Sequence, residues 1–171
     1  AASDSKHLMG ISHANPVWIH PDDASHHRIE DGQLVRIETE IGHFVNRARV
    51  TDGMSPGVLA CSHHMGRWKL EDSPGSNWGS STVRFEDLPD GRIRMRQIKV
   101  EKPVGNIDPD VDRSWWEEKG VHQNMSFPVQ TDPVSGMHCW HQKVRLVAAD
   151  STDQYGDLVS DRHTSIQAHK Q

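Results

Sequence analysis

Cysteine is scarce in this 171-residue sequence, which has only two, Cys61 and Cys139. They lie far apart along the chain and form neither a CxxC pair nor a zinc-ligand spacing. The pattern therefore calls for neither a disulfide framework nor a structural metal site. Such cysteine usage favours a reducing compartment, and we expect a cytoplasmic location. A periplasmic location would require a twin-arginine signal on the intact precursor.

Long apolar runs and an excess of positive charge are also lacking. No stretch approaches the roughly 20 apolar residues that cross a bilayer, and the first ten residues lack the pattern of a signal peptide. The net charge is −5, without the basic stripe of a nucleic-acid-binding protein. We therefore expect neither membrane insertion nor nucleic-acid binding. Only 34% of the residues are hydrophobic, so we expect a partner to bury part of the surface. The start at Ala1 rather than methionine suggests a processed product or a piece of a larger protein.

Catalytic sequence motifs are missing as well. The chain contains no HExxH, GxSxG, P-loop or GxGxxG, which are the usual signatures of zinc hydrolysis, serine hydrolysis and nucleotide binding. Thirteen histidines keep metal binding as an alternative, although pairs such as His63-His64 match no zinc-ligand motif. We therefore assign no catalytic residue and no metal ligand, and expect this chain alone to be an incomplete active site.

What is present is a series of short strands. Val17-Trp18-Ile19 lies between two prolines, and Gln33 to Ile41 alternates polar and apolar residues. Gly42 breaks this strand, and Phe44 to Val50 forms the second arm of a hairpin. Val58 to Cys61 has the apolar character of a buried strand. Short strands at this density indicate a closed or nearly closed barrel.

Two short helices are expected beside the strands. The first covers Ala24 to His27, where Asp22 or Asp23 can cap the amino end and complement the helix dipole. The second covers Arg113 to Lys119, because the acids and the proline upstream forbid a longer helix.

The second half of the chain contains fewer strands. Thr82 to Phe85 and Arg92 to Val100 read as a hairpin around a Pro-Asp-Gly turn, and Val144 to Ala148 as a last strand. We therefore predict one domain over residues 1–150. Residues 151–171 are polar, show no packing pattern and are expected to form an extended tail.

Polar and aromatic side chains gather in the loops that border these strands. Their donors and planar faces suit a heteroaromatic, phosphate-bearing ligand. The set consists of His13, Asn15, His63, His64, Arg67, Trp68 and Asn124. Each residue has a structural alternative: Asn15 can cap a turn, the two histidines can end a strand, and Trp68 can cover the core. Together, the loops favour a cofactor.

Three stretches carry a family resemblance: ISHANPVWIHPDDA with IEDGQLVRIETEIGHF, ARVTDGMSPGVLACSHHMGRW, and NMSFPVQTDPVSGMHCWHQKVRL. In this order they resemble the C-terminal molybdopterin-dinucleotide-binding domain of the dimethyl sulfoxide reductase family of molybdenum and tungsten oxidoreductases. The resemblance spans about residues 7 to 148. It implies a mainly β fold, a six-stranded double-psi β-barrel with short helices, followed here by a long C-terminal extension.

The resemblance also implies a cofactor and its contacts. The cofactor is molybdopterin guanine dinucleotide, while the metal ligand and any iron-sulfur cluster belong to segments that this chain lacks. The matching positions are Ser12, His13 and Asn15 in the first motif, His64, Gly66, Arg67 and Trp68 in the second, and Asn124 and Gln142 in the third. Arg67, with Arg47, would offset phosphate charge, and Gly66 would allow a close backbone approach.

We therefore expect the C-terminal domain of an oxidoreductase catalytic subunit, whose metal catalyses two-electron redox or oxygen-atom transfer. Its partners would be the remaining domains or a larger catalytic subunit, with an electron-transfer subunit. Two alternatives stay open: a separate small subunit that completes the cofactor site of a larger chain, and a barrel-type interaction module without cofactor.

Overall fold

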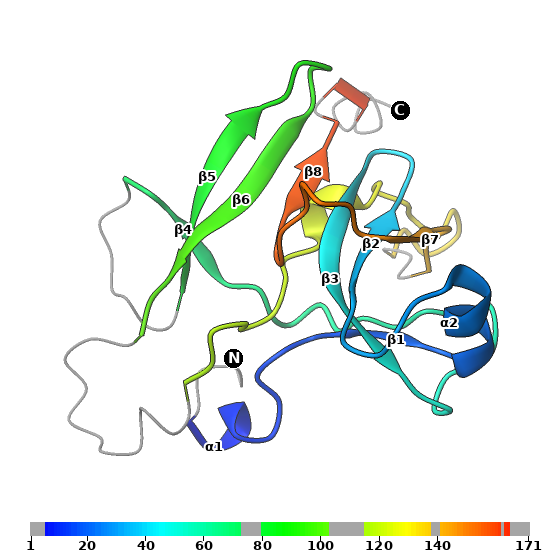
Figure 1. The fold of residues 1–171 in the computed structure, drawn as a ribbon. Coiled ribbons are helices and arrows are strands. Elements are labelled where there is room, and N and C mark those ends of the chain that lie inside the picture. The colour runs from blue at the N-terminus through cyan, green and yellow to red at the C-terminus, as the bar shows by residue number, and fades with distance from the viewer. Residues whose placement is uncertain (1–5, 73–79, 103–114, 138–140, 162, 165–171) are drawn as a thin grey trace.

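The computed structural model describes residues 6–72, 80–102, 115–137, 141–161 and 163–164. The helical elements are α1 Lys6–Met9, α2 Pro21–His27 and the 3-10 turn η3 Asn124–Ser126. The strands are β1 Val17–Ile19, β2 Leu34–Glu38, β3 Gly42–Val50, β4 Trp68–Leu70, β5 Ser81–Asp87, β6 Ile93–Val100, β7 Arg145–Ala148 and β8 Leu158–Ser160. Within the described residues, no helix is long and apolar enough to cross a membrane. The expectation of a mainly β chain with short helices is confirmed (Figure 1).

One sheet connects these strands, and β3 is its hub. Seven strands follow the order β4-β5-β6-β8-β3-β2-β7, and β1 pairs with β3 beside this path. The nine residues of β3 are enough for three partners: its beginning pairs with β8, its middle with β2, and its last residues run parallel to β1. In Figure 1, β8 lies between β3 and the group of β4, β5 and β6, which we call the wing.

The strand count and the closure differ from the expected six-stranded double-psi barrel. The described part of the chain has eight strands, and their pairings follow an open path from β4 to β7. Two of the additional strands, β4 and β8, are only three residues long. The count of six came from the family resemblance, and the residue patterns indicated neither β4 nor β8, because three residues are too few to show a clear alternation.

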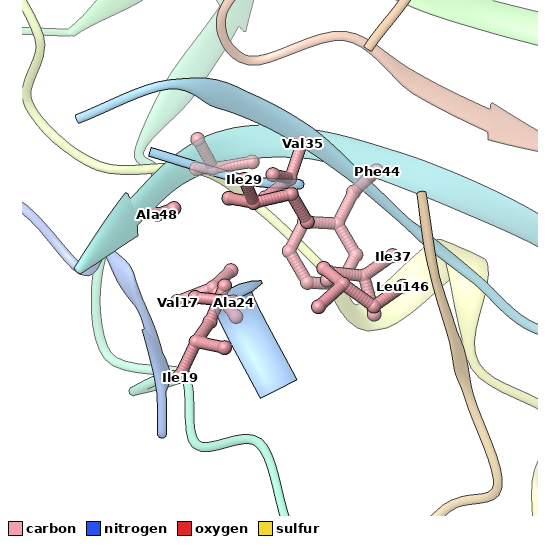
Figure 2. Packing of buried hydrophobic residues seen from close by; sticks show 10 residues of the cluster. Val17, Ile19, Ala24, Ile29, Val35, Ile37, Phe44, Ala48 and Leu146 are labelled. Atoms are coloured by element: carbon pink, nitrogen blue, oxygen red, sulfur yellow. The ribbon is translucent and has the colours of Figure 1, made fainter. Parts of the chain in front are cut away.

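The main core is enclosed by β1, α2, β2, β3 and β7. Its buried side chains gather around Phe44, as Figure 2 shows for most of them. They are Val17, Ile19, Ala24, Ile29, Val35, Ile37, Phe44, Ala48, Val121 and Leu146. The alternating exposure of β2 turns Val35 and Ile37 inward, as the period of two in its sequence predicts. The β2–β3 hairpin of the prediction is thus confirmed, and so is the strand β1.

The wing has a smaller apolar core. Val83 and Met95 pack with Leu158 of β8, and half-buried Trp68 adds to them. The predicted hairpin is confirmed in β5 and β6, which pair antiparallel from Ser81 to Asp87.

The expected unpacked tail is wrong for the described part of residues 151–171. Leu158–Ser160 forms β8, which pairs with β3 on one side and β6 on the other. Asp157 is buried, 1% exposed, and its carboxylate accepts hydrogen bonds from Arg96 at 3.0 Å and 2.5 Å. The three residues of β8 are flanked by polar residues and gave no periodic signal in the sequence. They form a strand because β3 and β6 pair with them on both sides. Residue 162 and residues 165–171 lie outside the described ranges.

Gly42 begins β3 instead of separating two strands. A Cβ at this position would lie 2.0 Å from the Val159 carbonyl oxygen, so glycine is what allows β8 to pair here. The predicted strand at Val58 to Cys61 is reduced to one bridge, between Ala60 and Trp18.

Both helix predictions need correction. The cap of α2 is His20, whose ring nitrogen accepts from the Asp22 amide, while Asp22 and Asp23 occupy the first turn. Residues 115–119 are not helical, and the remainder of the expected helix at Arg113 lies outside the described residues.

Candidate functional site

Asn15 holds three distant segments together. Its side chain is 2% exposed, and its Nδ2 donates to the Ser62 carbonyl at 2.6 Å and to the Val121 carbonyl at 3.0 Å. Its Oδ1 accepts from the Val121 amide at 2.7 Å. The Asn15 amide is thus occupied by the protein's own backbone, over separations of 47 and 106 residues. We call the contacts of Asn15 with Ser62 and Val121 the Asn15 clasp.

Three further side chains reinforce the Asn15 clasp. Asn46 of β3 donates to the Asn15 carbonyl at 2.7 Å, and Gln123 donates to the Ser62 carbonyl at 2.6 Å. The Cys61 thiol donates to the Asn15 carbonyl at 3.1 Å. Burial raises the pKa of the Cys61 thiol to about 12, so it stays protonated and unreactive at neutral pH. Sequence reasoning missed Asn46 and Gln123. For Asn46 there was one signal, because it is a polar residue at an inward position of strand β3.

Glycines let the two loops of the Asn15 clasp meet closely. Gly66 has φ +86°, and a Cβ there would lie 2.2 Å from the His122 amide nitrogen. Gly120 has φ +94°, and its Cβ would lie 2.4 Å from the Met65 Cβ. Gly66 therefore allows a close approach of the chain's own backbone, while its predicted approach to the cofactor stays a prediction.

A cleft of about 770 Å³ opens beside the Asn15 clasp, and we call it the His13 cleft. It brings together four of the predicted residues, namely Ser12, His13, Asn15 and His64. Trp18, Arg49 and Ser62 also line it, and no Asp or Glu is among its described lining residues. Ser12 and His64 are exposed, and His64 is hydrogen-bonded to the Ser62 hydroxyl. The His13 cleft therefore presents hydroxyl, imidazole and guanidinium groups, which suit an anionic ligand.

His13 forms a wall of this cleft. Its ring stacks on Trp116 with the centroids 4.2 Å apart and the planes 12° from parallel. Burial lowers the pKa of His13, so the ring is neutral at neutral pH. A neutral imidazole has one donor and one acceptor, but the Nδ1 of His13 is buried, so a ligand in the cleft cannot use both nitrogens.

A second cleft of about 760 Å³ shares Cys61 with the His13 cleft. This Asn124 cleft contains the predicted residues Asn124 and Gln142, together with His63. Its other lining residues include Phe44, Phe127 and Val144. The structure thus separates the predicted set into two groups, with Asn124 and Gln142 apart from His13.

The remaining predicted residues lie outside the described lining of both clefts. Trp68 is in β4, where its ring meets Phe85 and His122 edge-on at 5.8 Å and 6.1 Å. This position agrees with the structural alternative, in which Trp68 covers the core. Arg67 is exposed, and its carbonyl accepts from the Ser81 amide at 3.2 Å.

Arg47 is engaged by a carboxylate, although its side chain is 45% exposed and lines a further cleft together with His13. Its Nε and Nη2 each donate to Glu118 at 2.6 Å, and its Nη1 donates to the Gly32 carbonyl at 2.9 Å. The hydrogen bonds to Glu118 raise the pKa of Arg47 further. Among the described residues, no group of three His, Cys, Asp or Glu side chains is placed to hold a metal ion.

Comparison with known proteins identifies a family and several relatives. Residues 3–88, half of the chain, match the family model described as the molydopterin dinucleotide binding domain. Trimethylamine-N-oxide reductase of Haemophilus influenzae is 38% identical over 125 residues, covering 65% of this chain and 14% of that protein. Trimethylamine-N-oxide reductase of Salmonella typhimurium is 29% identical over 104 residues, which cover 54% of this chain and 12% of that protein.

A shorter similarity involves a putative dimethyl sulfoxide reductase catalytic subunit of Halobacterium salinarum. It is 44% identical over 41 residues, covering 24% of this chain and 5% of that protein. The chain thus spans only a small part of the length of the curated relatives it matches. From the family match and these relatives, the chain belongs to the molybdopterin dinucleotide-binding domains of the dimethyl sulfoxide reductase family.

Proposed function

We propose that this chain helps to bind molybdopterin guanine dinucleotide as the C-terminal domain of an oxidoreductase catalytic subunit of the trimethylamine-N-oxide or dimethyl sulfoxide reductase type. The observation that carries the proposal is the His13 cleft, whose described lining has donors and a guanidinium but no carboxylate. The residues that line it also fall within the part of the chain that matches the family model.

The residues of the His13 cleft fit a phosphate-bearing dinucleotide. The volume of about 770 Å³ lies within the range of ligand pockets. Arg49 and the Ser12 hydroxyl can meet phosphate oxygens, while the neutral His13 ring and the His64 ring can meet the edge of a pterin or guanine. Asn15 would act indirectly, as a positioning residue. Its buried side-chain amide fixes the backbone at Ser62 and therefore the loop that carries His64.

The metal of the cofactor would supply two-electron redox or oxygen-atom chemistry when the cofactor is bound. This chain's own contribution would be to bind and orient the organic part. In the whole enzyme, the metal ligand and any iron-sulfur cluster would come from other segments or subunits. Contact roles for Gly66, Arg67, Trp68, Asn124 and Gln142 remain predictions from the resemblance.

The test is to purify the full-length protein that carries this sequence. We expect about one molybdenum or tungsten per polypeptide and a fluorescent pterin after oxidation, and an intact mass much larger than that of these 171 residues. His13→Ala and His64→Ala should lower the pterin content, whereas His26→Ala, a change at an exposed residue of α2, should not. A native complex without pterin would contradict the proposal and favour the interaction module. A polypeptide of this size bound to a larger metal-containing chain would instead favour the reading as a separate small subunit.

A further inference from the structure

We propose that Trp18 and Arg49 contact the dinucleotide directly: a planar bicyclic ring of the ligand stacks on the Trp18 indole, and a phosphate oxygen pairs with the Arg49 guanidinium. This inference deepens the proposed function and rests on it. Neither residue belongs to the set that the sequence motifs selected, and both line the His13 cleft.

The register of two strands places these side chains together. β1 and β3 run parallel, and Trp18 is the register partner of Arg49. Val17 and Ile19 on β1 and Ala48 on β3 are buried, so the alternation turns Trp18 and Arg49 outward on the same face. Neighbouring strands are only about 4.8 Å apart, so a ring on Trp18 would have its substituents within reach of Arg49.

Trp18 is exposed, and its backbone is held by hydrogen bonds. Its side chain is 47% exposed, while its backbone amide donates to the Ala60 carbonyl at 2.8 Å and its carbonyl accepts from the Ala60 amide at 3.3 Å. Because the backbone that carries the indole is already fixed, a ring that covers it has only the side-chain torsions of Trp18 to order. Stacking of a base on an aromatic side chain contributes about 1–3 kcal/mol.

Arg49 is held more weakly than the other arginine of the same strand. Its Nη1 lies 3.3 Å from Asp31 Oδ2, with the two side chains 62% and 52% exposed. Arg47, by contrast, is engaged by both oxygens of Glu118 at 2.6 Å. An exposed single contact of this kind contributes little stability, so a phosphate can replace Asp31 at small cost. Asp31 keeps its own anchor, because its Oδ1 accepts from the Val50 amide at 2.8 Å.

The test measures how fast the full-length enzyme loses its pterin dinucleotide during dialysis. Trp18→Ala should increase the release rate on the order of tenfold, and Trp18→Phe should restore most of the retention because it keeps a stacking face. Arg49→Gln should increase release severalfold at low ionic strength and less at high ionic strength, because salt screens an exposed phosphate contact. The matched controls are Trp115→Ala and Arg84→Gln, both outside the described lining of the His13 cleft, and they should leave the rate unchanged.

The outcomes separate the two proposals. If wild-type enzyme contains no pterin, the proposed function fails and this inference falls with it. If wild-type enzyme retains pterin and the Trp18 and Arg49 variants release it at the wild-type rate, only this inference is overturned. A Trp18→Ala variant that unfolds more readily without cofactor, yet releases cofactor normally, would overturn it too and show that protein covers the indole. Quenching of Trp18 fluorescence in depleted enzyme by guanosine or by neopterin, absent in Trp18→Phe, identifies which ring stacks.

Discussion

The main core and the wing are stabilised in different ways. The main core buries ten apolar residues between α2 and four strands, whereas the buried cluster of the wing has three, with Trp68 packed against it. The wing also carries ion pairs, including Lys69 with Glu101 at 2.9 Å and Arg84 with Glu71 at 2.8 Å. The Arg84–Glu71 pair is exposed and contributes little to stability, whereas Lys69 and Glu101 are only 20% and 12% exposed. The wing therefore depends on its attachment through β8.

The His13 cleft lies on the better-packed side of this comparison. Its walls come from β1, β3 and the loops that the Asn15 clasp ties to them. A binding site built on packed strands and a satisfied amide network is largely formed before the ligand arrives, which lowers the entropic cost of binding. Substitutions in the main core should consequently be more damaging than equivalent ones in the wing.

The largest expected effect is that of Phe44→Ala. Phe44 is 1% exposed at the centre of the main core, so its truncation should lower the free energy of unfolding by about 4 kcal/mol. Phe85→Ala in β5, where the ring is 38% exposed, should cost about 1 kcal/mol. Urea denaturation of both variants measures the difference. Equal losses would mean that the two regions are packed equally well.

The second-largest expected loss of stability is that of Asn15→Ala. It leaves the buried Val121 amide without its acceptor and removes both side-chain donors, and we expect a loss of about 3 kcal/mol. Asn124→Ala, at an exposed residue of η3, serves as the control and should change stability little. Thermal unfolding of the two variants measures this difference in stability. A wild-type midpoint for Asn15→Ala would show that the loops are held by something other than the Asn15 clasp.

Asp157→Asn tests the attachment of the wing. The substitution removes the charge that meets Arg96 beside β8, where Asp157 is 1% exposed and Arg96 is 19% exposed. We expect a loss of about 2 kcal/mol, which is typical of a hydrogen bond to a charged group. Proteolysis should then cut the wing before the main core. Simultaneous loss of both regions would indicate one cooperative unit.

The smallest effect is that of mild acid. Burial lowers the folded-state pKa of His43 and His122 below the ordinary value of 6.5. The unfolded chain then binds more protons, so stability is complete above about pH 6.5 and decreases as the pH falls through and below this value. His122→Gln should flatten the decrease measured by urea denaturation between neutral and mildly acidic pH, whereas His26→Gln should not. Stability that rises on acidification would contradict this assignment.

The sequence predicted the elements whose signal is local. Alternation identified β2 and β6, whereas bounding prolines or turn residues marked β1, the other arms of the two hairpins and β7. It could not identify β8, which is three residues long and exists because β3 and β6 flank it.

The predicted site was less complete than the fold, for a related reason. The motifs selected Ser12, His13 and His64, which the structure places in one cleft. The Asn15 clasp joins residues 47 and 106 positions apart, and no local pattern reports such contacts. The pairing of Trp18 with Arg49 likewise appears only in the register of β1 against β3.

Hydrogen exchange of the full-length enzyme, with cofactor and after its removal, tests the central claim most directly. If the His13 cleft holds the dinucleotide, the amides of residues 12–18 and 60–64 should exchange more slowly in the loaded enzyme, while those of β5 change little. Equal exchange of the 12–18 and 60–64 segments in the two states would contradict the account, because a ligand seated there must shield them.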